Sequence, residues 1–160
     1  GNNQARWSIV NLGLVEIKAI DLNIQSAWRL GPELGLTAGL TYTYQEAVDA
    51  DKNSESYKDQ ITYVPVHSGS FMASAAYKQF SANYSFIYTG ERYNQSVNNI
   101  YNYVRPWYTH DAAVNYRTHI NKREMRITAE INNLLNQDYA VIQKFPMPGR
   151  HYLFSLTYNY

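Results

Sequence analysis

Apolar and polar residues alternate along most of this chain with a period of two. In the segment 34–45 (LGLTAGLTYTYQ), every even position is Leu, Ala or Tyr, and every odd position is Gly, Thr or Gln. Such alternation is typical of a β-strand with one apolar face, because successive side chains of a strand point to opposite sides. The last ten residues alternate in the same way and end on an aromatic residue, Tyr160. The pattern predicts an all-β chain with seven strands, in the segments 20–30, 34–45, 71–77, 80–89, 108–117, 125–132 and 151–160.

The connections between these strands alternate in length. Three are short turns, at 31–33, 78–79 and 118–122, of which the first contains Gly and Pro and the third contains Asn. Three are long and polar or rich in turn residues, at 46–64, 91–106 and 134–149. Tight turns at one edge and extended loops at the other are the plan of an outer-membrane β-barrel, whose turns are periplasmic and whose loops are extracellular. We therefore predict an antiparallel up-and-down meander of about seven strands.

Aromatic residues mark the two ends of the predicted strands. The chain has 16 Tyr among 160 residues, and Tyr favours both strands and the water boundary of a bilayer. Between the aromatic ends, the apolar face carries Leu, Ile, Ala, Val and Phe, which predicts contact with lipid. A soluble all-β binding or adhesion module that uses its Tyr face as a core is the alternative. The aromatic residues near the long loops are Tyr42, Tyr44, Tyr88, Tyr108 and Tyr152, and those near the short turns are Trp28, Tyr77, Tyr116, Tyr158 and Tyr160.

Charge and composition exclude several classes of protein. The net charge is +1 and no block of Lys or Arg stands out, so we expect no nucleic-acid partner. The chain has no Cys, which excludes a disulfide scaffold and a Cys-ligated metal. No apolar run approaches the roughly 20 residues of a membrane helix.

Seven antiparallel strands do not make a finished barrel. Single-chain bacterial barrels have even strand numbers, and an open sheet in hydrocarbon exposes unpaired backbone groups at its edges. We therefore expect this chain to be about a third of a larger wall. A small complete eight-stranded barrel is a second alternative, with the eighth strand in 4–11, where Trp7, Ile9 and Asn11 alternate.

The segment 131–150 (INNLLNQDYAVIQKFPMPGR) resembles the C-terminal end of TonB-dependent outer-membrane receptors. The family carries an Asn-Leu-(Phe/Leu)-(Asp/Asn)-x-x-Tyr stretch and then Pro-x-Pro-Gly-Arg. Two further stretches are similar to the family: 63–67, where Tyr-Val-Pro precedes His67, and 88–92, a Tyr-x-Gly-x-Arg sequence that ends on Arg92. Leu135, in place of the commoner Phe, and Ser155, in place of Gly, depart mildly from the family pattern. The matching motif residues are Asn133, Leu134, Asn136, Tyr139, Pro146, Pro148, Gly149 and Arg150.

This resemblance implies the C-terminal part of a 22-stranded transmembrane β-barrel in the outer membrane of a Gram-negative bacterium. Residues 1–160 are then one barrel portion without the N-terminal plug domain, and Gly1 is a candidate cloning scar. The implied function is import of a scarce nutrient, such as a ferric siderophore, cobalamin or a glycan, and not catalysis. The implied partners are outer-membrane lipid, the plug and upstream strands, TonB through the plug, and the barrel-assembly machinery, which would read Tyr158 and Tyr160 as a terminal signal.

Candidate chemical sites are weak in this sequence, and we expect no cofactor, no metal site and no catalytic set. Asp49, Asp51 and Asn53 have the spacing of a Ca²⁺ loop, but the positions that require Gly and Glu are Ser54 and Gln60. The four His have no metal-ligand spacing, and we expect them in interfacial or loop positions. Loop aromatics could stack on a flat or sugar-like ligand, and ordinary packing explains them equally well. These loop residues are Tyr93, Tyr101, Tyr103 and Trp107, interleaved with Asn94, Asn98, Asn99 and Arg105.

Overall fold

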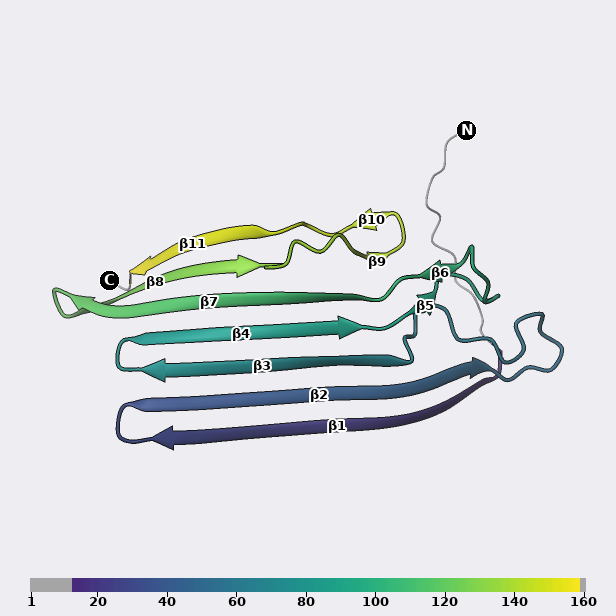
Figure 1. Cartoon of the computed structure of the whole chain (residues 1–160), viewed down its shortest axis with the longest axis horizontal. Helices are drawn as coiled ribbons and strands as arrows, with labels where there is room; N and C mark the ends of the chain where they lie inside the picture. The colour runs from purple at the N-terminus through teal and green to yellow at the C-terminus, as the bar shows by residue number, and fades with distance from the viewer. Residues whose placement is uncertain (1–12, 159–160) are drawn as a thin grey trace.

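The structure is a computed structural model, and it describes residues 13–158. Seven long strands form one sheet in which every neighbouring pair is antiparallel, in the order β1-β2-β3-β4-β7-β8-β11 (Figure 1). This confirms the predicted seven-stranded meander. The strands are β1 (Val15–Leu30), β2 (Leu34–Asp49), β3 (His67–Tyr77), β4 (Phe80–Thr89), β7 (Trp107–Ile120), β8 (Arg123–Asn132) and β11 (His151–Tyr158).

Several strands are longer than the alternation predicted, because a neighbouring strand continues to supply hydrogen-bond partners. β1 and β2 pair along their whole length, from Val15 opposite Asp49 to Leu30 opposite Leu34. The turn predicted at 118–122 is only the pair Asn121 and Lys122, whose φ angles are 51° and 65°. Two residues with positive φ suit a tight hairpin, because their twist matches that of the flanking strands.

Two small hairpins lie within the long loops, where the sequence predicted only irregular chain. β5 (Arg92–Tyr93) pairs with β6 (Tyr103–Val104), and β9 (Ala140–Ile142) pairs with β10 (Phe145–Pro146). These strands have two or three residues each, too few for a period of two to be visible. Among residues 13–158, no helix is long and apolar enough to cross a membrane.

The register aligns apolar residues of different strands into continuous rows on one face. Side chains alternate between the two faces along each strand, so paired residues of neighbouring strands share a face. Even positions of β1 pair with even positions of β2, and these pair with odd positions of β3. All of these residues therefore lie on the same face of the sheet. One such row crosses four strands through Ile24, Leu40, Phe71 and Phe86 and meets His110 on the fifth. A second crosses all seven through Trp28, Leu36, Ala75, Ala82, Val114, Ala129 and Phe154.

Aromatic rows border this apolar face on both sides and contain half of the ten predicted residues, whereas Trp28 lies in the second apolar row and Tyr152 pairs with Ile131. Tyr42, Tyr88 and Tyr108 fall in one row near the long loops, where Gly69 separates the first two. Tyr77, Phe80 and Tyr116 fall in one row near the short turns. Tyr160, which was predicted for the second belt, lies outside the described residues.

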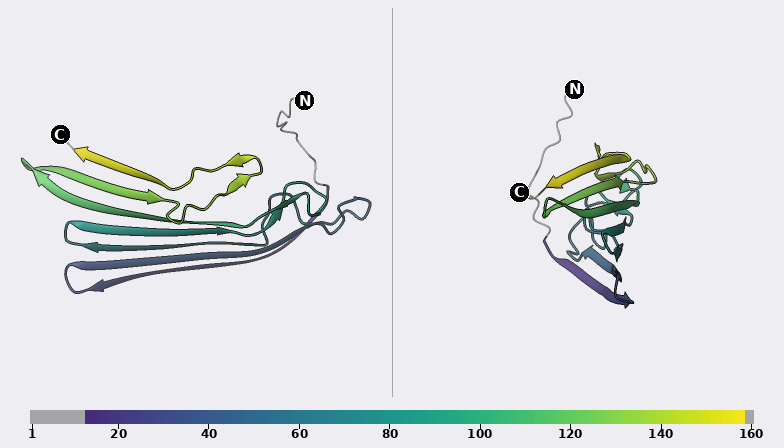
Figure 2. Two further views of the ribbon diagram at one scale, coloured as in Figure 1. Left: turned by 45° about the horizontal axis from the view of Figure 1, so that its top comes forward. Right: turned by 90° about the vertical axis from the view of Figure 1, so that its left-hand side faces the viewer.

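No second layer covers the sheet within the described residues, which contradicts the soluble two-layer alternative. Figure 2 shows a single curved layer. Among residues 13–158, Ala47 and Val104 are the buried apolar residues, and both lie near the long loops. Ile24 remains 50% exposed and Phe154 72% exposed. A sheet with this much uncovered apolar surface on one face requires a non-aqueous neighbour.

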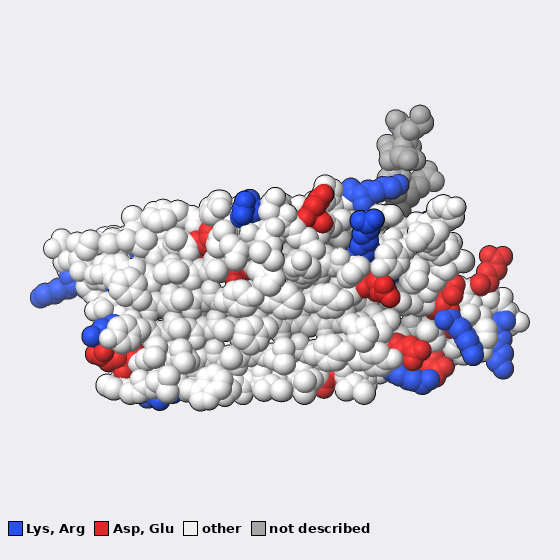
Figure 3. Space-filling view, in the orientation of Figure 1, with Lys and Arg blue, Asp and Glu red and all other residues white. Residues whose placement is uncertain are grey.

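The sheet is an open trough and not a closed barrel. β1 and β11 are the two outermost strands of the sheet, and they do not pair with each other in the described part of the chain. The eighth strand proposed for 4–11 lies outside the described residues. We refer to the side with turns 31–33, 78–79 and 121–122 as the short-turn edge, and to the opposite side as the long-loop edge. Charged side chains gather at these two ends of the molecule, with few between them (Figure 3).

Neighbouring positions on β1 test which face contacts lipid. We expect Ile24→Arg to lower the free energy of unfolding of the membrane-inserted barrel by about 2–4 kcal/mol, because an arginine near the bilayer midplane is costly. Gln25→Arg, one residue away on the opposite face, should cost much less. Urea unfolding of the intact barrel in liposomes measures both. Equal losses in the two variants would contradict this assignment.

Candidate functional site

The three long loops pack against one another at the long-loop edge, and we call residues 50–66, 90–106 and 133–150 together the loop cluster. The first and second loops are joined where the Tyr63 backbone N–H donates to the Tyr93 carbonyl at 2.8 Å, and where the Asn98 N–H donates to the Asp59 carboxylate at 2.9 Å. The third loop joins them through Gln143, whose N–H donates to the Tyr63 hydroxyl at 3.4 Å. The loop cluster is therefore one interconnected unit.

Arg92 lies at the centre of these contacts. It is only 2% exposed, and its guanidinium donates to four backbone carbonyls. Nη2 reaches Ala140 and Val141 of the third loop, each at 3.0 Å. Nη1 reaches Gly90 at 3.3 Å and Arg105 at 3.5 Å. Burial lowers the pKa of this guanidinium, but an arginine stays protonated, so one buried cation ties the second loop to the third.

Gly90, two residues before Arg92, permits a close approach between the strand ends beneath the loop cluster. Its N–H donates to the His67 carbonyl at 2.8 Å. A Cβ at this position would lie 2.7 Å from that same oxygen, which real Cβ atoms do not tolerate. The two family-like stretches that contain His67 and Gly90 are thus in direct contact, and this explains why glycine is required in the second.

Asn133 organises the start of the third loop. It is 3% exposed and has a φ of 52°, a conformation that Asn tolerates better than most residues. Its backbone N–H donates to the Asp111 carboxylate at 2.7 Å. Its side chain exchanges two hydrogen bonds with the Gln137 backbone, each at 2.8 Å, and Nδ2 also reaches the Pro148 carbonyl at 3.4 Å. Leu134 continues the ladder by donating its N–H to the His110 carbonyl at 2.8 Å.

The other motif residues close the third loop onto β11. The Asn136 carboxamide oxygen accepts the Arg150 N–H at 2.8 Å, and a Cβ on Gly149 would lie 3.0 Å from that oxygen. The Arg150 guanidinium reaches the Leu134 carbonyl at 3.4 Å. Pro146, in β10, faces Ala140. The motif residues therefore form one hydrogen-bonded loop closure. The sequence marked these residues as a family-like motif but did not predict the contacts between them.

Tyr139 completes this closure by packing against β7. Its ring centroid lies 4.7 Å from that of Trp107, and its carbonyl accepts the Met147 N–H at 2.9 Å. Burial raises the pKa of the Tyr139 hydroxyl, and the nearby Asp111 carboxylate adds to the effect. Tyr139 thus anchors the third loop on the sheet.

The loop aromatics singled out as ligand candidates do not converge on one site. Tyr93 and Tyr103 contact each other edge to face at 6.0 Å. The Tyr103 hydroxyl donates to the Glu91 carboxylate at 2.9 Å, and this hydrogen bond raises the pKa of Tyr103. Trp107 instead packs on Tyr139, and Tyr101 is 86% exposed. Packing within the loop cluster accounts for three of these four aromatics.

The candidate Ca²⁺ loop uses its side chains to shape the chain. The Asp49 carboxylate accepts the Asp51 N–H at 2.9 Å and the Ser56 hydroxyl at 2.8 Å. The Asp51 carboxylate accepts the Asn53 N–H at 2.9 Å. Within residues 13–158, no group of three or more His, Asp or Glu is arranged to hold a metal ion.

The concave face of the trough carries many polar side chains, together with Met72, and contains a groove of about 640 Å³. Cross-strand hydroxyl pairs stabilise it, such as Thr37 with Ser74 at 2.5 Å and Thr41 with Ser70 at 2.7 Å. Further inward-facing residues that line the groove are Gln25, Asn83, Ser85, Asp111, Glu130 and Asn132. This arrangement suits a wall with lipid on one side and water or polar protein on the other.

Comparison with known proteins agrees with this geometry. The family model described as TonB dependent receptor-like, beta-barrel, matches residues 1–134. The chain belongs to this family. The siderophore receptor PiuA from Acinetobacter baumannii has a similar crystal structure, with a TM-score of 0.63 and 19% sequence identity. The match covers 89% of this chain and 22% of PiuA, so the chain spans about a fifth of that receptor. At this identity, the likeness supports the fold.

Membership of the TonB-dependent receptors places the barrel in the outer membrane of a Gram-negative bacterium, with the apolar face against lipid. Two histidines lie on this lipid-facing side of the receptor wall near the long-loop edge. His67 Nδ1 is 2.8 Å from the Tyr42 hydroxyl, and His110 Nδ1 is 2.6 Å from the Tyr84 hydroxyl. In each case the tyrosine hydroxyl gives one ring nitrogen of the histidine a hydrogen-bond partner, which lipid does not provide.

Two features of the receptor wall were not predicted as sites from the sequence. Arg92 was visible only as the last residue of a family-like stretch, and its contacts with the third loop join residues 48 or more positions apart. The inward-facing pair of Arg117 and Arg126 gave no motif at all. Tyr158, the predicted assembly signal, faces Met125 at the end of β11, and nothing in its surroundings tests that role.

Arg92 offers a direct test of how the receptor loops are held. We expect Arg92→Gln to increase amide hydrogen exchange about tenfold or more in both the β5–β6 and β9–β10 hairpins, because several buried carbonyls lose a charged donor, at about 1–3 kcal/mol. Hydrogen exchange of the intact receptor in detergent, followed by mass spectrometry, measures this. Arg105→Gln removes an exposed cation from the same loop and should leave exchange unchanged. Faster exchange in one hairpin alone would show that Arg92 does not couple the two loops.

Proposed function

We propose that residues 1–160 are the C-terminal part of the barrel of a TonB-dependent nutrient importer. The observation that carries this proposal is the open seven-stranded sheet, with an apolar face between two aromatic rows and three long loops packed together at one edge. A single wall of this kind cannot close a pore by itself. Its contribution to import is a lipid-facing surface, a polar concave face and part of an extracellular vestibule.

The position of each surface follows from the family architecture. The short turns are periplasmic and the loop cluster is extracellular. β1 and β11 pair with barrel strands outside this chain, which together complete a 22-stranded barrel and satisfy the exposed backbone groups. The concave face contacts a plug domain and water, and energy comes from TonB through that plug. No step of this role requires a catalytic residue.

A ferric siderophore is the first substrate to test, since PiuA is a siderophore receptor. Cobalamin and glycans are the other candidate classes. The exposed ring of Tyr101 and the neighbouring Ile100, which is 78% exposed, give the second loop an apolar tip suited to contact with a flat or sugar-like ligand.

Uptake measurements in the native host test the proposed function. We expect deletion of the gene for the intact receptor to abolish energy-dependent uptake of one nutrient class among labelled ferric siderophores, cobalamin and oligosaccharides. Loss of TonB should abolish the same uptake, because import against a gradient needs its energy. The gene with Tyr101→Ala should restore barrel levels but weaken binding of the imported compound. Unchanged uptake of all three classes in the deletion strain would contradict the proposal.

The C-terminal aromatics are proposed to be read by the barrel-assembly machinery through strand addition. We expect the change of Tyr158 and Tyr160 together to Asp, or removal of Tyr160, to prevent assembly of the intact receptor. Thr157→Asp places a negative charge on the opposite face of β11 and should assemble. Heat-modifiable mobility of the receptor in outer-membrane fractions reports the folded barrel. Wild-type amounts of folded barrel in the double variant would refute the assembly signal.

A further inference from the structure

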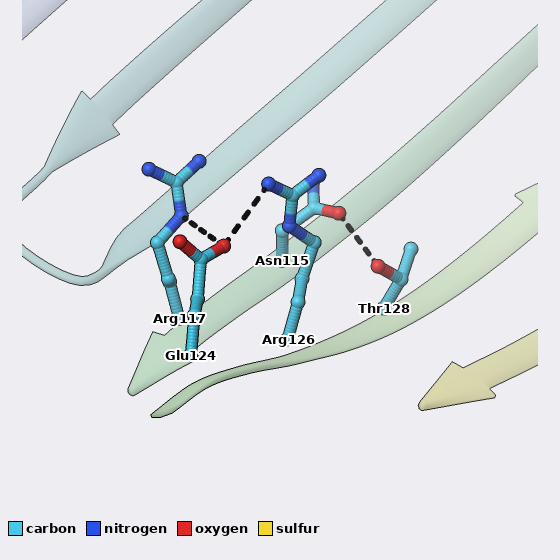
Figure 4. Close-up of polar contacts among 5 residues, drawn as sticks. All are labelled: Asn115, Arg117, Glu124, Arg126 and Thr128. Carbon is cyan, nitrogen blue, oxygen red and sulfur yellow. Dashed lines mark hydrogen bonds and ion pairs between the residues drawn. The ribbon is translucent and has the colours of Figure 1, made fainter. Parts of the chain in front are cut away.

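Two arginines face each other on the concave side near the short-turn edge. Arg117 of β7 and Arg126 of β8 occupy directly opposite register positions (Figure 4). Like charges at opposite positions of an antiparallel pair are destabilising. The next pair on this face is Asn115 and Thr128, in which the Thr128 hydroxyl donates to the Asn115 carboxamide oxygen at 2.8 Å. A local conflict of charge is therefore built into an otherwise well-paired sheet.

Glu124 offsets this conflict only in part. Its Oε1 atom lies 3.6 Å from Arg117 Nε and 3.4 Å from Arg126 Nη2. One carboxylate oxygen thus serves two guanidinium groups, and one positive charge remains without a counter-charge in this trio. Figure 4 shows the outer edge of the Arg117 guanidinium directed away from Glu124. The Arg117 and Arg126 side chains are 58% and 45% exposed, so their remaining donors are accessible.

These arginines line a hollow of about 210 Å³ at the short-turn edge. The turn between β3 and β4 forms its other side, held in place where the Arg117 N–H donates to the Gln79 carbonyl at 2.8 Å. That turn contributes Lys78, which forms an ion pair with Glu33 at 3.2 Å. Three cations thus border the hollow, together with the polar side chains of Ser81 and Asn115.

We propose that this hollow is an anion-binding site that holds one carboxylate or phosphate group between Arg117 and Arg126. The free edge of a guanidinium matches two oxygens of such a group, which gives short, charge-assisted hydrogen bonds. Because its oxygen already accepts from Thr128, the Asn115 amide is oriented to donate to the same ligand. A bound anion supplies the charge that Glu124 alone does not, and removes the repulsion across the strand pair.

The same chemistry has two possible sources. One is a free anion, such as phosphate, that reaches the concave face from solution. The other is the carboxylate of an Asp or Glu in a segment of the same polypeptide that lies outside this chain and reaches the concave face. The site itself depends on the charge arrangement of β7 and β8, and it does not depend on which nutrient is imported.

The test measures phosphate binding and thermal unfolding of the intact receptor in detergent, at constant ionic strength. Arg117→Gln and Arg126→Gln each remove one side of the site. Arg123→Gln removes a cation from the same strand at a position that faces the opposite side of the sheet, and it is the matched control. Isothermal titration with inorganic phosphate gives the affinity, and the midpoint of unfolding gives the stability.

For a free anion, we expect wild type and Arg123→Gln to bind phosphate, and Arg117→Gln and Arg126→Gln to lose about tenfold or more in affinity. For an internal carboxylate, we expect no phosphate binding, and both site variants should unfold at a lower temperature than wild type and Arg123→Gln. If the site is empty, removal of one arginine only relieves the repulsion between Arg117 and Arg126. The proposal would therefore be overturned if no protein binds phosphate and both site variants unfold at or above the wild-type temperature. Equal phosphate affinity in all four proteins would also overturn it.

Discussion

The hydrogen-bond ladder of the antiparallel sheet is the constraint on which the rest of this structure depends. Most small domains are held by an apolar core, but the described residues bury only Ala47 and Val104 as apolar side chains. What holds the seven strands together is the backbone pairing of each strand with its neighbours. In lipid this pairing is obligatory, because an unpaired N–H or C=O costs several kcal/mol there. The uninterrupted register from β1 to β11 is therefore both the fold and the main source of its stability.

Above the sheet, where the chain leaves the ladder, buried polar groups take over its role. Arg92 and Asn133 are both almost fully buried; Arg92 directs its side chain at backbone groups of the second and third loops, and Asn133 at backbone groups of the third loop. A loop without a core has many carbonyls and N–H groups to satisfy, and a guanidinium or carboxamide can serve several at once. The loop cluster is consequently ordered by a few multivalent side chains, and glycines such as Gly90 and Gly149 allow the segments to approach closely enough.

This difference in organisation decides what the sequence could predict. The strands and the lipid-facing side were predictable because each alternation of period two is local, as in 34–45, and register only has to join like faces. The short hairpins β5–β6 and β9–β10 were not, since two or three residues show no period. The contacts of Arg92 with Ala140 and Val141 were also inaccessible, because they join positions about 50 residues apart and leave no trace in spacing. Family-like motifs marked the residues of the loop closure, and the structure supplied the hydrogen bonds that explain them.

The arginines at the two ends of the wall differ in their burial and in their hydrogen-bond partners. At the long-loop edge, Arg92 is almost fully buried and its guanidinium donates to four carbonyls of its own chain, so it is closed to a ligand. At the short-turn edge, Arg117 and Arg126 share one carboxylate oxygen and keep accessible donors. A buried cation with several hydrogen bonds holds the surrounding segments in place, whereas an accessible pair with free donors attracts an anion. Because one continuous sheet joins these two ends, the wall has a loop end held together by a buried cation and a turn end whose cations stay accessible.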